Sequence, residues 1–312
     1  AGNLAATTNA NDGVINLGTL AVDGTIALVT NGSGAATVVN DAGLNFATST
    51  VGGALSARAT SGNITQSGAL AITGATTLRA TSGNNITLNN ASNDFQAAVS
   101  ITSGNNVTLV DANAIILGAS TVSGAFSATA TTGNMTQSGA LDIEGATTLV
   151  TTAQGATIDL STVTTNAFTS ELLITTNDND VPADTTYAAH VKIDGGTTNL
   201  IIGTSTIDGD LTLLSGGTIT DTDSSTVTVK GALSATTDAG SSLITLNDLE
   251  VDGSFTLAPN SAGAVTIVND AGLDLAASTM GGTFSGTATT GDISDSGTLT
   301  ITGAATFITT AA

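Results

Sequence analysis

Hydrophobic and polar residues alternate in short stretches that follow recurring glycines. After Gly53, Leu55 and Ala57 fall on one face of the chain, and Arg58 falls on the other. This period of two is typical of a half-buried β-strand. A turn rich in Gly, Ser and Asn follows, and a second alternating run occupies residues 69–73. The pattern therefore predicts about three short strands per unit, separated by polar turns, and it shows no helical spacing.

The same pattern returns along the chain in register. Residues 14–83 recur as residues 243–312, an offset of 229 (243 minus 14). A partial third copy lies between them, shifted by 71 (124 minus 53), so that Gly53 corresponds to Gly124. A shorter unit repeats inside each copy, as in the 21 residues from Gly53 to Gly74. Such repetition indicates a stack of similar coils, which builds length and surface rather than one catalytic pocket.

Large and small residues exchange places between neighbouring coils. Leu55 is followed one coil later by Thr76, and Ala57 by Leu78, and two other pairs of coils show the same exchange. Coils stacked about 4.8 Å apart need a bulky side chain beside a small one. The unit is too short for a propeller blade, and hairpin signals do not separate every pair of strands. We therefore predict an all-β fold, a right-handed parallel β-helix (solenoid) of about 12–13 coils with about 21–29 residues each.

The β-helix is expected to be one continuous segment over residues 1–312, belonging to a longer repeat array. Its core should receive six bulky side chains, namely Leu55, Leu78, Phe126, Leu149, Phe284 and Phe307. Four side chains of the same strands should point outward, namely Arg58, Arg79, Val150 and Ile308. Arg58 and Arg79 would then stack on neighbouring coils, either as a docking spot or as two solvated surface residues.

Residues 177–190 lack alternation and are expected to leave the solenoid as a loop. The interval between the coil starts near residues 167 and 209 is long enough for two coils, or for one coil that carries a loop; we favour the loop. The segment holds the only Tyr and the only His of the chain, together with several carboxylates. Its candidate binding residues are Asp178, Asp180, Asp184, Tyr187 and His190.

The charge balance excludes several classes of partner. The chain has 25 acidic and 4 basic residues, a net charge of −21, whereas nucleic-acid binding requires clustered Lys and Arg. Anionic lipid is disfavoured for the same reason. An apolar run of about 18 residues is absent, so membrane insertion is not expected. The chain contains no cysteine, so disulfides do not stabilise it.

The residue types of the chain give little support for catalysis or for a bound cofactor. A single His and no Cys argue against a nucleophilic triad and against zinc. Polysaccharide-acting β-helix enzymes use clustered carboxylates with Arg or Lys, and here the acidic residues are scattered. We therefore predict no enzyme and no cofactor. Calcium is the alternative, through the acidic loop or the turn at 221–223, although EF-hand and Gly-Gly-x-Gly-x-Asp patterns are missing.

Amide side chains recur at equivalent turns. Asn63, Asn134 and Asp292 correspond to one another, as do Gln66 and Gln137. Rows of amides and hydroxyls on a flat face can bind sugars, and stacked amide ladders within the solenoid are the other explanation. We favour the ladders.

The segments Ser61–Leu70 and Gly145–Leu149 carry a resemblance to a known family. Their Gly-, Ala-, Thr- and Asn-rich pattern resembles the repeats of filamentous-haemagglutinin-like giant bacterial exoproteins, over essentially the whole chain. The resemblance implies a secreted right-handed β-helix at the cell surface, acting as an adhesin stalk or fibre. The Asn-Pro-Asn-Gly signature of that family's secretion domain is absent.

These observations together predict a structural role. The leading hypothesis is a segment of an extracellular filament or adhesin shaft on the bacterial surface, without catalysis. Its partner would be itself, stacked end to end as tandem repeats or as separate subunits. The alternative is a module that binds a cell-surface receptor or a glycan through residues 177–190, and the third hypothesis is a polysaccharide-acting enzyme.

Overall fold

The computed structural model describes residues 2–177 and 188–310 of the chain. Their regular elements are all β-strands, so this part of the chain contains no helix that could cross a membrane. The chain is divided into two compact units, Ala1–Gly145 and Ala146–Ala312. In both units the strands pair in parallel and form a β-solenoid, as the alternation and the short period predicted.

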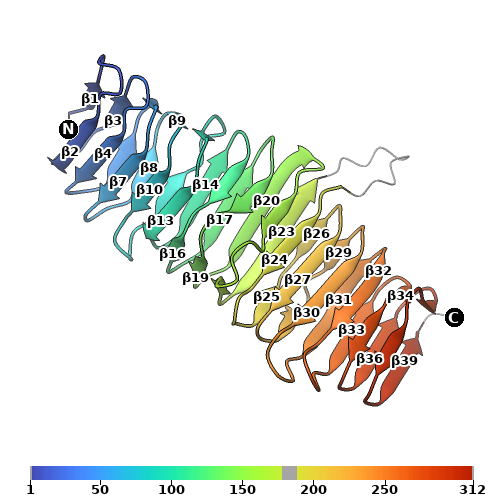
Figure 1. Cartoon of the computed structure of the whole chain (residues 1–312). Coiled ribbons are helices and arrows are strands. Elements are labelled where there is room, and N and C mark those ends of the chain that lie inside the picture. Colours follow the sequence, from blue (N-terminus) through green and yellow to red (C-terminus); the bar gives the residue numbers. More distant parts are fainter. Residues whose placement is uncertain (1, 178–187, 311–312) are drawn as a thin grey trace. The chain divides into compact units, whose positions relative to one another are not determined.

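The first unit, blue to green in Figure 1, contains 19 strands. They are β1 (Leu4–Thr7), β2 (Ile15–Leu20), β3 (Ile26–Val29), β4 (Ala36–Asn40), β5 (Leu44–Phe46), β6 (Ser49–Val51), β7 (Leu55–Ala59), β8 (Ile64–Gln66), β9 (Leu70–Ile72), β10 (Thr76–Arg79), β11 (Ile86–Leu88), β12 (Asp94–Phe95), β13 (Val99–Ser103), β14 (Val107–Asp111), β15 (Ile115–Leu117), β16 (Ser120–Val122), β17 (Phe126–Ala130), β18 (Met135–Gln137) and β19 (Leu141–Ile143).

The second unit, green to red in Figure 1, contains the remaining strands of the described residues. They are β20 (Thr147–Gln154), β21 (Ile158–Leu160), β22 (Ala167–Phe168), β23 (Glu171–Asn177), β24 (Val191–Asp194), β25 (Leu200–Ile202), β26 (Ser205–Ile207), β27 (Leu211–Ser215), β28 (Ile219–Asp221), β29 (Val227–Val229), β30 (Leu233–Thr237), β31 (Ile244–Val251), β32 (Ser254–Ala258), β33 (Val265–Asn269), β34 (Leu273–Leu275), β35 (Ser278–Met280), β36 (Phe284–Ala288), β37 (Ile293–Asp295), β38 (Leu299–Ile301) and β39 (Ala305–Thr309).

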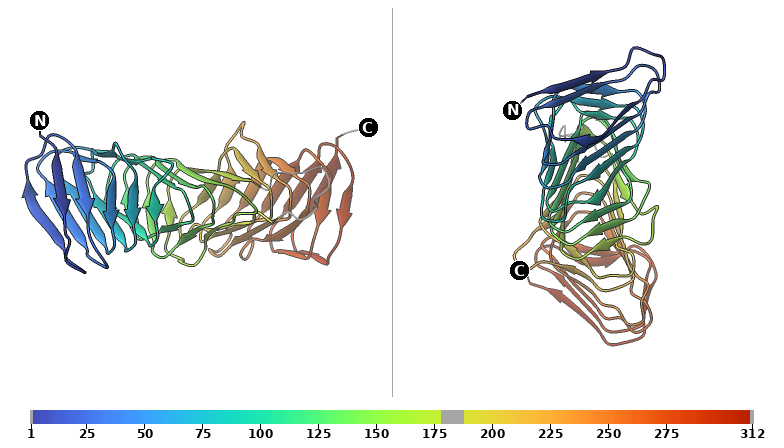
Figure 2. Two further views of the ribbon diagram at one scale, coloured as in Figure 1. Left: turned by 90° about the horizontal axis from the view of Figure 1, so that it is seen from above. Right: turned by 90° about the vertical axis from the view of Figure 1, so that its left-hand side faces the viewer.

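Two parallel sheets form the main walls of each unit, and Figure 2 shows strands of successive turns lying side by side. Wall 1 takes one strand from each turn: β2, β4, β7, β10, β13, β15 and β18 in the first unit, and β21, β24, β27, β30, β32, β34 and β37 in the second. Wall 2 contains most of the other strands, often two short ones per turn, such as β5 and β6. Smaller pairings, β16 with β19 and β35 with β38, complete the turns.

The number of turns is higher than the sequence suggested. The chain has about 14 turns, whereas we expected about 12–13 coils. Coils were counted from recurring starts such as Gly53 and Gly74, and several strands of wall 1, for example β4 and β24, do not follow such a start. In particular, the interval between residues 167 and 209 holds β24, β25 and β26, and not only one coil with a loop.

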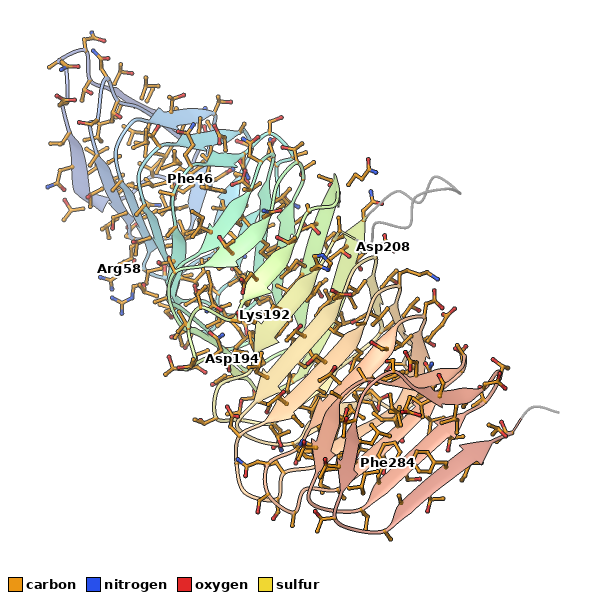
Figure 3. All side chains as sticks on the ribbon, turned by 45° about the vertical axis from the view of Figure 1, so that its right-hand side comes forward. Phe46, Arg58, Lys192, Asp194, Asp208 and Phe284 are labelled. Atoms are coloured by element: carbon orange, nitrogen blue, oxygen red, sulfur yellow. The ribbon has the colours of Figure 1, made fainter. Side chains whose placement is uncertain are left out.

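Side chains alternate between core and solvent as predicted. Leu55, Leu78, Phe126, Leu149 and Phe284 are at most 1% exposed. Arg58 and Arg79 are exposed, and Val150 is half-buried. Phe46 and Phe284 lie within the stacked turns in Figure 3, whereas Arg58 projects from its strand. Full burial of each large apolar side chain contributes about 1.5–3 kcal/mol, so the rows of Leu, Ile, Val and Phe are the main source of stability.

Phe307 was expected inside and is 47% exposed. Its strand β39 pairs with β36, so that Phe307 lies over Gly286 and its ring packs on Phe284 at a centroid distance of 5.3 Å. The side chain thus has the predicted direction, but among the described residues no strand covers the other side of β39. Ile308, on the opposite face, is 42% exposed as predicted.

Stacking in register produces the predicted exchange of large and small core residues. Leu55 lies beside Thr76 and Ala57 beside Leu78 in the pair β7–β10. Phe284 lies beside Ala305 in the pair β36–β39. One cost is visible, because the buried hydroxyl of Thr76 has no hydrogen-bond partner. The small residues therefore fill the space left by their large neighbours, at the expense of an unsatisfied polar group.

Amide side chains link successive turns, as the favoured explanation proposed. Asn63 Oδ1 accepts a hydrogen bond from the backbone N–H of Asn85, and Asn85 Oδ1 accepts one from Asn106. Inside the first unit, Gln66 and Asn93 exchange two side-chain hydrogen bonds of 2.8 and 2.9 Å. These ladders satisfy backbone groups at the corners, where the sheets are interrupted.

Long strands change wall at defined points. In the first unit, β7 and β13 belong to wall 1, but β14, which follows β13 directly, belongs to wall 2 with β17. In the second unit, β23 of wall 2 is followed directly by β24 of wall 1, and β32 of wall 1 by β33 of wall 2. Elsewhere two short strands, such as β8 and β9, usually separate one long strand from the next.

Candidate functional site

The predicted loop at residues 177–190 begins at the last residue of β23, Asn177, and ends directly before β24 in the second unit. Four of its candidate residues, Asp178, Asp180, Asp184 and Tyr187, lie outside the described residues. The fifth, His190, is described and stands directly before β24. The candidate site can therefore be built from the strands at the base of this segment.

His190 interacts with a carboxylate of the following turn. Its Nδ1 lies 3.3 Å from Asp210 Oδ2 and accepts a hydrogen bond of 3.0 Å from the backbone N–H of Asp210. Both side chains are about half exposed, at 51% and 52%. Asp210 Oδ1 in turn accepts the backbone N–H of Ala232, at 2.8 Å. The pair thus joins three successive turns, in the same way as the asparagine ladder of the first unit.

Lys192 stands on the outer face of β24, close to His190 in the sequence. In register, it lies beside Asp159 of β21 and Thr212 of β27. The Asp159 carboxylate accepts hydrogen bonds from the backbone N–H and hydroxyl of Ser161, at 3.0 and 2.6 Å. Residues of β21, β24 and β27, and the residue just before each of these strands, line a cleft of about 350 Å³, which includes His190, Lys192 and Asp210. Figure 3 shows Lys192 on the outer surface of the second unit.

The chemistry of this cleft suits recognition of a polar ligand. It offers one imidazole, one ammonium group and two carboxylates, and the carboxylates already hold backbone or hydroxyl hydrogens. A histidine–carboxylate pair supports catalysis when it activates a nucleophile within hydrogen-bond reach, and here Nδ1 is used by the backbone of Asp210. The chain has no cysteine to serve as that nucleophile.

Metal-ligand geometry is absent from the part of the chain that the structure describes. No group of three or more His, Cys, Asp or Glu side chains there could hold a metal ion. In the acidic turn at 221–223, Asp221 Oδ2 accepts the backbone N–H groups of Asn247 and Asp248, and burial raises the pKa of its carboxyl. Calcium binding by Asp178, Asp180 and Asp184 stays a prediction, because these residues are not described.

Arg58 and Arg79 stack on neighbouring turns, as expected from their spacing after a glycine. They are partners in the register of β7 and β10, and both are exposed. Val39 and Ser103 continue the same outward row on the adjacent strands. The row thus places two cationic groups next to each other on the outer face of wall 1.

Sequence reasoning found His190 but missed two of its neighbours. Asp210 and Lys192 were not singled out, since their proximity to His190 depends on the register between β24, β27 and the turns that precede them. The one signal was position, because Gly209 was recognised as a coil start and Asp210 directly follows it.

A family model of repeats of unknown function (DUF5649) matches residues 33–102, 104–175, 188–258 and 262–312. The chain belongs to this family. The starts of the four DUF5649 matches, at residues 33, 104, 188 and 262, each lie three residues before a long strand, namely before β4, β14, β24 and β33. No curated protein and no solved structure matches the chain significantly.

The DUF5649 repeat therefore has a structural meaning. Three of its four starts lie where one long strand directly follows another on a different wall, at β13–β14, β23–β24 and β32–β33; the same change also occurs inside the third repeat, at β30–β31. Each full repeat begins and ends with a long strand, as residues 33–102 do with β4 and β13. A repeat thus comprises three turns and one additional strand, so the next repeat begins on a different wall.

Proposed function

We propose that the chain is a structural segment of an extracellular fibre or adhesin shaft on a bacterial surface, without catalytic activity. The observation that carries this proposal is the direct joining of DUF5649 repeats. Long strand follows long strand at the junctions, and the stacked hydrogen bonds continue from one repeat into the next within each unit. Direct joining of this kind makes a repeat array stiff, because each repeat stabilises its neighbour.

Composition supports the same role. The chain has 25 acidic residues and only 4 basic ones, so its surface is strongly negative. Repulsion between such surfaces limits the lateral association of solenoids. The absence of cysteine is compatible with stability that rests on ladders and core rows alone. The resemblance to filamentous-haemagglutinin-like exoproteins supports the surface location, and DUF5649 repeats support the repetitive architecture without naming a role.

Self-association is the proposed partner interaction. The outer edge of β39 carries backbone groups and the exposed side chains of Phe307 and Ile308. A further turn stacked on this edge would pair the backbone groups and cover Phe307, as β39 covers Phe284. That turn would come from the same polypeptide or from a second copy. Burying the exposed part of Phe307 favours either arrangement.

A receptor- or glycan-binding module is the second candidate, favoured by the cleft beside His190 and Lys192. Deletion of residues 178–187 separates the two roles, because it leaves β23 and β24 in place. If the chain is a shaft, cells that carry the deletion keep their adhesion, and the purified variant keeps its circular dichroism spectrum. Loss of adhesion with an unchanged strand spectrum assigns binding to the loop instead. The substitution His190→Ala is the matched control for the cleft without the loop.

The proposed lack of catalysis is tested directly. The purified chain is incubated with a panel of bacterial and plant polysaccharides, and new reducing ends or unsaturated products are measured. The proposal expects none above the level of heat-denatured protein. Product formation that is lost in an Asp210→Asn variant of unchanged fold would establish an enzyme.

A further inference from the structure

Charged residues are distributed unevenly over the two units. The first unit has two basic and seven acidic residues, a net charge of −5 (2 minus 7), and the second has two basic and 18 acidic residues, a net charge of −16 (2 minus 18). Both cations of the first unit, Arg58 and Arg79, lie on the outer face of wall 1, in β7 and β10. The seven strands of this wall in the first unit contain no aspartate or glutamate. One face of an acidic chain is therefore locally basic.

The two arginine side chains lie beside each other without a carboxylate partner. They are register partners on neighbouring strands, which are about 4.8 Å apart. Both are exposed, and Arg58 projects from its strand in Figure 3. Neither guanidinium has a hydrogen bond or an ion pair with another described residue, including Asp41, which directly follows β4. Like charges opposite each other on neighbouring strands are destabilising, so an anion that contacts both would stabilise the arrangement.

A row of neutral polar side chains runs beside the arginine pair on the same face. Five successive strands of wall 1 place one such residue each in register, namely Asn16, Thr37, Ser56, Thr77 and Ser100. These side chains are exposed or half-buried, and none has a hydrogen bond with another described residue. Their amide and hydroxyl groups are therefore available to a ligand that crosses the strands.

The available groups define the chemistry of the ligand. A guanidinium pairs well with a planar carboxylate, through two parallel hydrogen bonds. Hydroxyl and amide side chains both donate and accept hydrogen bonds, as sugar hydroxyls do. None of the large exposed apolar side chains lies on these strands, whereas protein interfaces are built around such anchors. The strands also lack aromatic side chains for stacking bases. An acidic polysaccharide fits this face best, because it combines carboxylates with hydroxyls.

The overall net charge of −21 is compatible with an anionic ligand at this face. At physiological ionic strength the Debye length is about 8 Å, so a bound carboxylate senses mainly the charges in its immediate surroundings. Those surroundings are two unpaired guanidinium groups on strands without acidic residues. Local attraction therefore decides binding here, and most of the carboxylates belong to the second unit.

We propose that wall 1 of the first unit binds a polyuronate, a polysaccharide that carries a carboxylate on each sugar unit. The polysaccharide crosses the strands, its carboxylates pair with Arg58 and Arg79, and its hydroxyls bond the neighbouring polar row. Exposed ion pairs contribute little individually, so a short oligomer binds weakly, with a Kd on the order of 1 mM. This inference does not depend on the proposed shaft function.

The test is titration of the ¹⁵N-labelled full chain with an oligogalacturonate and with its methyl ester, followed by amide chemical shifts. The ester keeps the sugar hydroxyls but carries no charge. We expect saturable shifts centred on β4, β7 and β10 with the acid alone, and an affinity that falls as salt is added. The absence of saturable shifts, or equal shifts with the ester, overturns the proposal. Equal binding of polyglutamate overturns the saccharide assignment, and binding of dextran sulfate alone overturns the carboxylate assignment.

Two variants of equal net charge separate local from overall electrostatics. The double substitution Arg58→Gln and Arg79→Gln should weaken the affinity at least about fivefold. The control, Ser127→Glu with Thr266→Glu on the outer face of wall 2, makes the chain more negative by the same two charges and should keep the affinity within about twofold. If the arginine double variant loses its circular dichroism spectrum, Arg79→Gln alone replaces it and should weaken the affinity about twofold. Undiminished affinity in a folded arginine variant, or an equal loss in the control, overturns the assignment.

Discussion

Asp111 occupies a place that two other repeats give to a neutral amide. It ends β14, as Asn40 ends β4 and Asn269 ends β33, and all three side chains are fully buried. Asp111 accepts backbone N–H groups from Phe95 and Asn113, at 3.0 and 2.8 Å. Burial nevertheless raises the pKa of its carboxyl to about 6, against these two hydrogen bonds and with a further contribution from the charge of Asp94.

The raised pKa makes stability depend on pH. The folded chain holds this proton up to a pH of about 6, whereas the unfolded chain releases it near 3.8. The folded state is therefore favoured most below pH 3.8, and this contribution is lost as the pH rises through 6. The difference between the two pKa values corresponds to about 3 kcal/mol, at 1.36 kcal/mol per pH unit. At neutral pH, Asp111 is a buried charge that destabilises the first unit.

The substitution Asp111→Asn should remove this cost, because an amide stays neutral; its Oδ1 keeps one of the two backbone N–H bonds, and its Nδ2 must turn to a carbonyl, as that of Asn40 does. We expect the variant to be more stable than the natural chain by about 3 kcal/mol at pH 8, and by less than about 1 kcal/mol at pH 4. Urea unfolding at several pH values measures the difference, since urea does not screen charges. Hydrogen exchange of the β14 amides localises it to the first unit.

An exposed carboxylate provides the control. Asp142, at the centre of β19, is exposed, and its replacement by Asn removes the same charge. We expect Asp142→Asn to change the free energy of unfolding by no more than about 0.5 kcal/mol. A gain that is equal at pH 4 and pH 8 for Asp111→Asn, or no gain at pH 8, would refute the reasoning.

Three further predictions concern the stacked core. Thr76→Val should stabilise the first unit by about 1 kcal/mol in urea unfolding, because it removes a buried hydroxyl without a partner, while outward Thr77→Val should not. Leu78→Ala should destabilise it by about 2–5 kcal/mol by leaving a cavity, and a loss below 1 kcal/mol would contradict its burial. Gly74→Ala should lower the thermal midpoint and the exchange protection of β10, because the new Cβ would lie 2.5 Å from the backbone N of Ala54; unchanged protection would contradict the close stacking at this turn.

The directions of side chains could be predicted from sequence because they follow a local rule. In a strand the period of two assigns Leu55 inward and Arg58 outward, whatever wall the strand joins. The wall itself could not be predicted. Gly53 and Gly124 are equivalent in sequence, yet β7 belongs to wall 1 and β17 to wall 2. A shift of 71 residues does not complete a whole number of turns, and only the pairing of strands reveals this.

The candidate site was harder to predict for the same reason. The composition of residues 177–190 marked His190, but its carboxylate partner lies 20 residues away and is brought close by the register.

The spacing of stacked turns in the native, full-length protein tests the central claim most directly. The native protein is purified from its source, and oriented samples are examined by fibre diffraction or by power spectra of electron micrographs. A shaft of stacked DUF5649 repeats predicts a filament one solenoid wide, with a meridional reflection near 4.8 Å along its axis. A discrete particle without continuing turns, or a filament whose strands run along the axis, would contradict it.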